Sequence, residues 1–206
     1  QALALTRAPV IASHSAARAV GDASRNLDDE QLTALKENGG VVQTVAFQSY
    51  VNPEKNQAHR DALDKWEKRV AEAMGFELMG RRARFGRSDS DREPYDIASR
   101  PVQEAIDARV DAEVNSIAPP VDVSDLADHI DYLVNLIGLE HVGISSDFDG
   151  GGGVEGWNDA AETFNVTLEL VRRGYTEQQI GMLWSGNLLR VLDEVQAVAA
   201  EIQAGS

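Results

Sequence analysis

Three short apolar runs stand out in a chain whose other apolar residues recur mostly at helical spacing. The runs cover residues 9–13, 41–47 and 141–146, and each is followed by a polar residue. Runs of this length that are rich in valine and isoleucine are typical of buried strands. The pattern therefore predicts three strands, at 9–13, 41–47 and 141–146.

Helical patterns fill most of the intervals around these runs. Asn26 or Asp28 can cap a helix that stops near Gly39, and Ser124 is predicted to cap a helix that Gly138 ends. Residues 80–101 are rich in Arg, Ser, Asp, Gly and Pro, a composition that predicts a loop. Further helices are expected at 53–74, 102–115 and 159–173, the last of them ended by Gly174. Thr176 and Gln179 form a capping box that opens a short helix, and a last helix begins near Ser185.

The order of these elements predicts the fold class. Strand, helix, strand, a long helical excursion, helix, strand and helix follow one another, which indicates an α/β fold with a parallel sheet. Residues 51–120 form an insertion on one strand-to-helix connection, and in a barrel such an insertion would sit over the active-site face. A (β/α)8 barrel typically needs about 250 residues. Three strands therefore predict only the last part of a barrel.

Composition narrows the class of protein. The chain has 206 residues, of which 43% are hydrophobic, and a formal net charge of −15. Such acidity argues against nucleic acid or an anionic membrane as a partner, because both select clustered positive charge. The basic cluster of Arg81, Arg82, Arg84 and Arg87 is followed at once by acidic residues. No apolar run approaches the roughly 20 residues of a membrane span, so a soluble chain is expected.

Three predicted strand ends carry reactive side chains: His14, Tyr50 and Asp147. The carboxyl ends of parallel strands form the rim where α/β proteins keep their chemistry. Asp147 is the strongest candidate, because it leaves a buried strand just before four consecutive glycines. Arg25, in the polar loop after the first strand, can hold a carboxylate in a bidentate pair. The alternatives are a core histidine, a packing tyrosine, a turn aspartate and a surface arginine.

The same segment partly matches the patterns of a metal-binding loop and of a phosphate-binding loop. Cysteine is absent, so a metal would need His, Asp, Glu or water as ligands. Asp147, Asp149 and Gly150 make half of a calcium-loop pattern, but position twelve of that loop is Asn158, where a glutamate is required. A phosphate loop needs Lys followed by Ser or Thr after its glycines, and this pair does not follow.

The other histidines are expected to have ordinary roles. His59 lies in a charged helical pattern, and His129 lies beside Asp128 and Asp131, so both are predicted to lie at the surface. His141 begins the third predicted strand, at the rim opposite the candidate site, where a contribution to stability is the default.

A set of sequence blocks belongs together in one family pattern. The blocks are Val10-Ile11-Ala12-Ser13-His14-Ser15-Ala16-Ala17-Arg18-Ala19-Val20, Arg25-Asn26-Leu27, Asp128-His129-Ile130-Asp131-Tyr132, Val142-Gly143-Ile144-Ser145-Ser146-Asp147-Phe148-Asp149-Gly150, Glu169-Leu170-Val171-Arg172-Arg173-Gly174-Tyr175 and Gly186-Asn187-Leu188-Leu189-Arg190-Val191. In this order they resemble the membrane (renal) dipeptidase family, zinc peptidases of the amidohydrolase type built on a (β/α)8 barrel. The resemblance is to the bacterial branch, and it covers nearly the whole chain except about 52–118.

The resemblance implies a fold and a role for each candidate residue. The chain would be the C-terminal portion of a single hydrolase domain, the last three βα units of a TIM barrel with a helical insertion at about 51–120. His14 matches a ligand of the second of two zinc ions. Arg25 matches the arginine that holds the substrate's carboxylate, and Tyr50 matches a tyrosine that lines the site. Asp147 matches the acid/base carboxylate beside the metal-bound water.

The function implied by the resemblance is zinc-dependent hydrolysis of dipeptides. Two zinc ions bridged by hydroxide would supply the nucleophile and polarise the scissile carbonyl, and Asp147 would carry the proton to the leaving amine. The family's first-strand His-x-Asp pair, its bridging Glu and two further histidines lie N-terminal to His14, outside this sequence. The chain is therefore expected to be an inactive fragment that needs its N-terminal half, a complementing chain or the association of two pieces. A second copy, in a homodimer, is the other protein partner expected.

Two further expectations complete the sequence-based picture. The alternative to the enzyme is a catalytically inactive family member that acts as a binding or scaffold protein. The location expected from the bacterial resemblance is the cytoplasm or the periplasm, without a choice between them.

Overall fold

The computed structural model describes residues 2–80, 83 and 86–205 of the chain. The chain divides into two compact units. The sheet unit comprises Gln1–Glu54 and Val121–Ser206, and the helical unit comprises Lys55–Pro120. Three arginines of the basic cluster noted in the sequence, Arg81, Arg82 and Arg84, lie outside the described residues.

The sheet unit alternates strands with helices. Its strands are β1 (Ile11–Ser15), β2 (Val41–Val45) and β3 (Val142–Ser145). Its α-helices are α1 (Ala2–Leu5), α2 (Asp29–Glu37), α3 (Gln48–Val51), α7 (Val123–Ile137), α8 (Thr163–Arg172), α9 (Glu177–Gly181) and α10 (Asn187–Ala204). Shorter helical turns are η2 (Leu139–His141), η3 (Phe148–Gly150), η4 (Ala160–Glu162) and η5 (Met182–Gly186).

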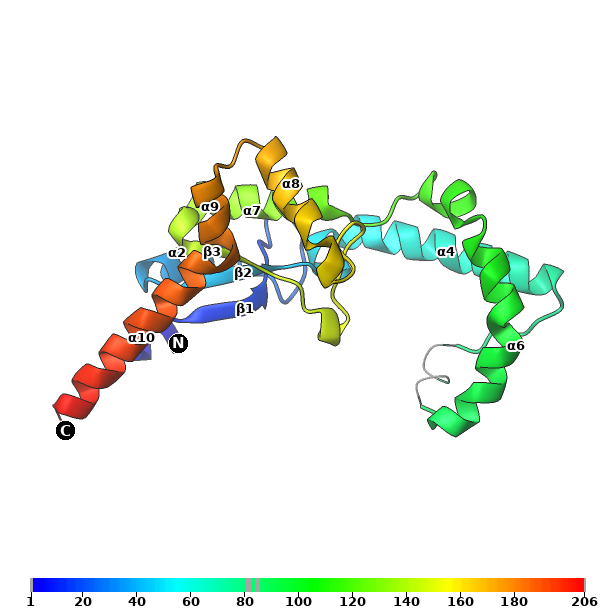
Figure 1. The fold of residues 1–206 in the computed structure, drawn as a ribbon, viewed down its shortest axis with the longest axis horizontal. Coiled ribbons are helices and arrows are strands. Elements are labelled where there is room, and N and C mark those ends of the chain that lie inside the picture. The colour runs from blue at the N-terminus through cyan, green and yellow to red at the C-terminus, as the bar shows by residue number, and fades with distance from the viewer. Residues whose placement is uncertain (1, 81–82, 84–85, 206) are drawn as a thin grey trace. The chain divides into compact units, whose positions relative to one another are not determined.

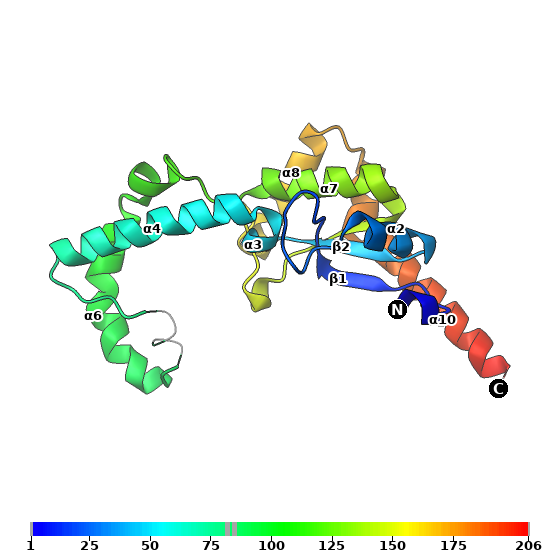
Figure 2. The ribbon, with the colours of Figure 1, turned by 180° about the vertical axis from the view of Figure 1, so that it is seen from behind.

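The strands form one parallel sheet in the order β1-β2-β3. Figure 1 shows β2 between its two neighbours, and α2, α7 and α10 all contact β2. Between Ala12 and Ser15 the register of β1 against β2 shifts, so β1 has one residue more than β2 in the stretch that holds Ser13 and His14. The parallel α/β arrangement predicted from the alternation of strands and helices is confirmed. Seen from behind, in Figure 2, β1 forms one edge of the sheet.

One apolar core lies between the sheet and its helices. Val42 of β2 and Ile144 of β3 belong to the same buried cluster as side chains of α2 and α7. The members from α7 recur every three or four residues and so form one stripe along the helix; they are Leu126, Ile130, Leu133 and Ile137. Complete burial of side chains of this size stabilises a fold by about 1.5–3 kcal/mol each relative to exposure.

The opposite face of the sheet is tightly packed at its centre and open at its edge. A Cβ at Gly143 of β3 would lie 2.4 Å from Oε1 of Gln43 on β2, so only glycine leaves room for that side chain. At the edge, Ile11 of β1 is 48% exposed. In the described part of the chain β1 pairs only with β2. Its free edge can accept another strand.

The helix caps correct the sequence prediction at one place and confirm it at another. Asp28 caps α2 in a reciprocal capping box with Gln31, as one of the two predicted candidates. The predicted cap of α7, Ser124, was wrong. Asp122 caps that helix because its carboxylate accepts hydrogen bonds from the backbone N–H groups of Ser124 and Asp125. Asp125 completes the box by accepting from the N–H of Asp122.

The helical unit contains most of α4 (Pro53–Ala73), together with α6 (Asp89–Asp107) and η1 (Asp111–Asn115). The helix predicted at 53–74 is confirmed. The loop predicted at 80–101 is wrong from Asp89 onward, because α6 begins there with Ser88 as its cap and continues through two prolines. Its apolar residues Val102 and Ile106 pack with Trp66 of α4, and this burial outweighs the helix-breaking composition.

The longest described helices are α4, α6 and α10, with 21, 19 and 18 residues. Each carries charged residues along its length. Within the described residues, no helix combines the length and the apolar character that crossing a bilayer requires.

Candidate active site

His14 stands near the carboxyl end of β1, in the irregular part of that strand. Its Nδ1 lies 2.7 Å from Oγ of Ser13, and its Nε2 lies 2.8 Å from Nη2 of Arg25. A guanidinium can only donate, so Nε2 is the acceptor in that pair. The proton of a neutral imidazole then sits on Nδ1 and is donated to Ser13.

Arg25 comes from the loop that joins β1 to α2. Two hydrogen bonds between backbone groups tie the ends of this loop together, from the N–H of Leu27 to the carbonyl of Ala16 and from the N–H of Arg18 to the carbonyl of Leu27. The Arg25 guanidinium lies at the exposed surface, with its central carbon 6.0 Å from the centre of the Tyr50 ring. The predicted carboxylate-binding residue is thus placed between His14 and Tyr50.

Tyr50 lies in a helix and not at the end of a strand, where the sequence predicted it. The strand predicted at 41–47 ends at Val45, and Tyr50 lies in the short helix α3, because the N–H groups of Tyr50 and Val51 both turn back to the carbonyl of Phe47. The ring of Tyr50 stacks on that of Phe47 at 4.5 Å between centres. Tyr50 nevertheless lies beyond the carboxyl end of β2, on the same rim as His14.

Asp147 follows β3 in a strained backbone conformation. Among the described residues, Asp147 is the one non-glycine residue with a positive φ, with φ 56° and ψ 32°. Its carbonyl accepts hydrogen bonds from the N–H groups of Gly150 and Gly152, at 2.9 and 2.7 Å. Left-handed backbone costs a side-chain-bearing residue on the order of 1 kcal/mol and is concentrated at functional sites. Aspartate tolerates this conformation better than most other side chains, so the backbone favours a short polar residue at this position.

The glycines after Asp147 meet two separate geometric needs. A Cβ at Gly150 would lie 2.4 Å from Oδ1 of Asp147, and one at Gly152 would lie 2.1 Å from the carbonyl oxygen of Ser146. Gly151 and Gly153 have φ values of 92° and 125°, which other residues rarely adopt. The N–H of Gly153 also donates to the carbonyl of Ala46, beyond β2, at 2.6 Å. The loop therefore wraps Asp147 closely and fastens it beside β2.

The candidate residues thus share one rim of the sheet. Arg25 is hydrogen-bonded to His14 and lies over the ring of Tyr50 at 6.0 Å from its centre, and Asp147 follows β3, the strand on the other side of β2. A link between the two groups runs through Phe47, which stacks on Tyr50 and lies 4.0 Å from the position of a Cβ on Gly151.

The hydrogen bond at Nδ1 of His14 is of the kind that metal-binding histidines make, while Nε2 is occupied by Arg25. A histidine that binds metal through one nitrogen usually donates its other N–H to an oxygen, as Nδ1 of His14 does to Ser13. In the described part of the chain, no group of three or more His, Asp or Glu side chains is placed to hold a metal ion. His14 can therefore supply one ligand, and the others would have to come from outside these residues.

His129 is a buried residue that the sequence prediction placed at the surface. It is fully buried in α7, with its Nδ1 3.2 Å from the N–H of Ala17 and its Nε2 2.6 Å from the carbonyl oxygen of Val51. Desolvation lowers its pKa below the ordinary value of 6.5, and the hydrogen bond to Val51 opposes that shift only in part. The signal was present in the sequence, because position 129 follows Leu126 by three and precedes Leu133 by four residues on the apolar stripe.

The remaining two histidines, His59 and His141, each lie close to a backbone carbonyl oxygen. His59 is half-buried, with Nδ1 2.8 Å from the carbonyl oxygen of Ala118 within the helical unit, and so is not simply solvated. His141 lies where it was expected, at the amino end of β3, with Nδ1 2.8 Å from the carbonyl oxygen of Gly40.

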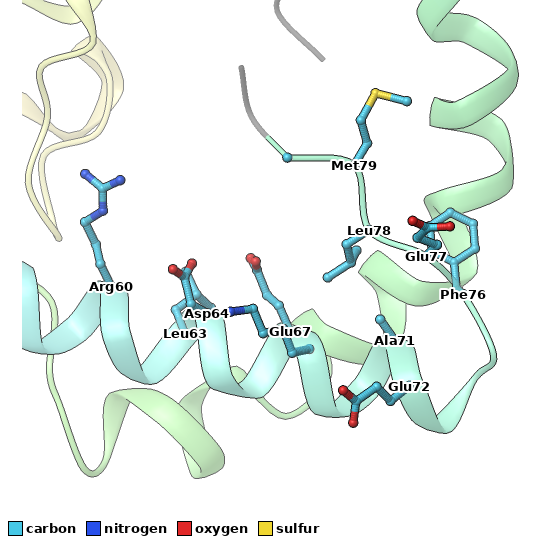
Figure 3. A pocket seen from close by; sticks show the side chains of 12 residues that line it. Arg60, Leu63, Asp64, Glu67, Ala71, Glu72, Phe76, Glu77, Leu78 and Met79 are labelled. Atoms are coloured by element: carbon cyan, nitrogen blue, oxygen red, sulfur yellow. The ribbon is translucent and has the colours of Figure 1, made fainter. Parts of the chain in front are cut away.

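A separate cavity of about 520 Å³ lies in the helical unit and holds none of the candidate residues. Figure 3 shows Arg60, Asp64 and Glu67 of α4 along one side of it. Leu78 and Met79 come from the segment that follows α4. Its lining mixes apolar and mainly acidic side chains, and the chemistry predicted from the sequence lies elsewhere, at the rim of the sheet.

Comparison with known proteins identifies the family. The model of membrane dipeptidases, peptidase family M19, matches residues 1–206. The chain belongs to this family. The resemblance noted in the sequence blocks is therefore confirmed, and the relatives of the chain are named dipeptidases.

Two curated relatives illustrate the match. Dipeptidase aclJ of Aspergillus oryzae is 31% identical over 199 residues, which cover 96% of this chain and 32% of the relative. Human dipeptidase 3 is 29% identical over 205 residues, which cover 99% of this chain and 29% of the relative. The chain thus spans about a third of the length of these proteins.

Two solved structures share the fold of this chain. The probable dipeptidase PvdM from Pseudomonas aeruginosa matches with a TM-score of 0.63 and 37% identity, over 95% of this chain and 47% of PvdM. A metallo peptidase from Rhodobacter sphaeroides, liganded with a phosphinate mimic of the dipeptide L-Ala-D-Ala, matches with a TM-score of 0.58 and 22% identity, over 93% of this chain and 38% of that protein. The second likeness concerns the fold alone.

Proposed function

We propose that the protein to which this chain belongs hydrolyses dipeptides with zinc. The observation that supports the proposal most is the chain of contacts from His14 through Arg25 to Tyr50, on the same rim as the strained Asp147. Family membership supplies the reaction class. The roles of the individual residues and the identity of the metal are part of the proposal.

Each residue has a role that suits its chemistry. Arg25 holds the terminal carboxylate of a dipeptide, for which a planar guanidinium has two parallel donors. By holding that carboxylate, Arg25 limits the substrate to the size of a dipeptide, and Tyr50 lines the site beside it. His14 provides one zinc ligand through Nε2. When bound, two zinc ions would lower the pKa of water and polarise the scissile carbonyl.

Asp147 is proposed as the group that moves the proton. Its carboxylate takes a proton from the attacking water and delivers it to the leaving amine, which is general base and then general acid catalysis. The left-handed backbone and the close approach of Gly150 fix the direction of this carboxylate. A proton-transfer group gains from such fixation, because its distance to the reacting atoms decides its efficiency.

We further propose that the sheet unit is the last three βα units of a TIM barrel. The free edge of β1, with its exposed Ile11, and the coverage of 47% of PvdM support this arrangement. The other strands would bring the remaining zinc ligands, from an N-terminal half of the same protein or from a complementing chain. A homodimer of this chain would close the edge without adding those ligands. Residues 1–206 alone are therefore expected to be inactive.

The test compares the complete protein with residues 1–206 alone. Both are incubated with a panel of small dipeptides, with zinc and after chelation, and the release of amino acids is measured. The proposal predicts zinc-dependent turnover by the complete protein and none by residues 1–206. A complete protein that binds dipeptides without cleaving them would favour the inactive binding member instead. Turnover that survives complete chelation would exclude the zinc mechanism.

A further inference from the structure

The short helix α3 ends on two backbone carbonyls that need donors from elsewhere. The last carbonyls of a helix have no partner within it. The carbonyl oxygen of Tyr50 accepts a hydrogen bond from Nδ2 of Asn26 at 2.7 Å, and that of Val51 lies 2.6 Å from Nε2 of His129. Both donor side chains are almost completely buried, at 1% and 0% exposure. The end of α3 is thus fixed by two side chains from distant parts of the sequence.

His129 also holds the loop after β1. Its Nδ1 accepts a hydrogen bond from the N–H of Ala17 at 3.2 Å, so Nε2 carries the proton and donates to Val51. One imidazole therefore joins the loop that carries Arg25 to the helix that carries Tyr50. Its lowered pKa agrees with this neutral form.

Asn26 makes the same connection from the other side. Its Nδ2 donates both to the carbonyl of Gly21, in its own loop, and to that of Tyr50. At Gly21 a Cβ would lie 2.5 Å from the carbonyl oxygen of Tyr50, so the loop backbone itself rests on α3. Asn26 follows Arg25 directly in the sequence and binds the carbonyl of Tyr50, so it connects the backbone next to Arg25 with the residue Tyr50 itself.

We infer that His129 and Asn26 are positioning residues that set the relative placement of Arg25 and Tyr50. Neither touches the proposed substrate pocket directly; each acts through the backbone of the loop or helix that it binds. The inference rests on the proposed function, because the pocket for the substrate's carboxylate is defined there. It adds that the affinity for the dipeptide depends on two buried groups in α7 and in the β1–α2 loop.

The chain offers a matched control for each residue. Asn187 is also buried, at 2% exposure, and its Nδ2 also donates to two carbonyls, those of Leu139 and Val142, beside the amino end of β3. His141 also binds a backbone carbonyl, that of Gly40, at the same distant end of the sheet. We expect the loss of either control side chain to lower stability without displacing the rim.

The experiment compares Asn26→Ala with Asn187→Ala and His129→Phe with His141→Phe in the complete protein. We expect Asn26→Ala and His129→Phe to raise KM for a dipeptide about tenfold with a smaller change in kcat, because misplacement of a binding group by about 1 Å can cost up to a hundredfold. The controls are expected to leave KM within about twofold, with a loss of thermal stability that is comparable for Asn187→Ala and smaller for His141→Phe, because His141 is only half-buried. His129→Gln, whose amide can still donate to Val51, should recover most of the loss.

Hydrogen exchange gives a second readout that does not depend on turnover. In His129→Phe the amide of Ala17 is expected to exchange at least about tenfold faster than in the wild type, and in His141→Phe its exchange rate is expected to be unchanged.

Equal effects of the test and control variants on KM and on the exchange of the Ala17 amide would overturn the inference. If the wild-type protein cleaves no dipeptide, the proposed function fails, and the exchange of Ala17 and of the α3 amides still decides whether the two residues hold the rim. If His129→Phe does not fold, the KM and exchange data of Asn26→Ala and His129→Gln decide whether the two residues position the rim.

Discussion

The Nε2 of His14 and the Nη2 of Arg25 lie 2.8 Å apart. The lone pair on Nε2 of His14, the proposed metal ligand, accepts a hydrogen bond from Arg25, the proposed carboxylate-binding residue. The same lone pair can bind a metal ion instead, but not at the same time. Metal binding at His14 would require Arg25 to turn away, toward the open rim where a substrate carboxylate would lie.

Replacement of Arg25 tests its role in binding. Arg25→Met in the complete protein is expected to raise KM for dipeptides by roughly a hundredfold, because a charge-assisted pair contributes about 1.5–3 kcal/mol. Arg25→Lys should recover little, since it lacks the planar fork. Steady-state kinetics measure both effects. Arg172→Met serves as control, because that side chain is 67% exposed on α8. Unchanged KM in Arg25→Met would exclude a carboxylate pocket at this residue.

Replacement of Asp147 separates chemistry from backbone strain. Asp147→Asn keeps a side chain that tolerates the left-handed region, so it should lower kcat by about 10²–10⁴ at nearly unchanged stability. Asp147→Ala should in addition lose about 1 kcal/mol of stability, because alanine is strained at positive φ. Kinetics and urea unfolding measure the two effects. Near-normal turnover in Asp147→Asn with its metal retained would remove Asp147 from the mechanism.

Gly150 tests whether the glycine loop orients Asp147. The Cβ of Gly150→Ala would collide with the Asp147 carboxylate, so kcat is expected to fall at least about tenfold through loss of orientation. Gly181→Ala is the matched control, since in α9 nothing lies within 4 Å of the added carbon. That substitution should be neutral or stabilise the helix by up to about 1 kcal/mol. A kcat equal to wild type in both variants would contradict the prediction.

His129 predicts how stability depends on pH. Its pKa is lowered in the folded chain, mainly by burial, and Asp128 and Asp125 oppose the shift only weakly. Below the ordinary value of 6.5 the unfolded chain binds a proton that the folded chain does not, so this contribution to stability is full above 6.5 and decreases as the pH falls. Urea unfolding measures the free energy of unfolding of the wild type and of His129→Gln between about pH 5 and pH 8. The difference between these two free energies should become smaller as the pH falls. A difference independent of pH would contradict the assignment.

Local sequence patterns predicted the sheet and most helix ends because the deciding interactions are short in sequence. Gly39, Gly138 and Gly174 follow the ends of helices, where each has a positive φ, and Thr176 and Gln179 form a capping box, so these helix boundaries agree with the prediction. All three predicted strands exist, but the first runs from Ile11 to Ser15, two residues later than predicted, and the second ends two residues earlier. Reactive residues at strand ends likewise indicated the rim. Position alone makes His14, Arg25 and Asp147 candidates, and the family resemblance adds their proposed roles.

The errors arose where contacts distant in sequence decide the structure. Residues 89–101 form a helix despite Pro94 and Pro101, because the apolar side chains that follow pack on α4. Tyr50 entered a helix because the chain turns at Phe47, where no glycine or proline signals it. His129 was assigned to the surface because its acidic neighbours outweighed its place on the apolar stripe.

The contacts of the glycine run after Asp147 fix the number of residues in this loop. Two of its members are glycine because other atoms occupy the space of a side chain, and two because of their backbone angles. A library that randomises these positions should therefore recover glycine at each, for two independent reasons. Insertion of a single residue would change which glycine faces Asp147 and which meets the carbonyl of Ala46. We expect the number of residues in this loop to be as restricted as their identity, which distinguishes it from a glycine linker of the same composition.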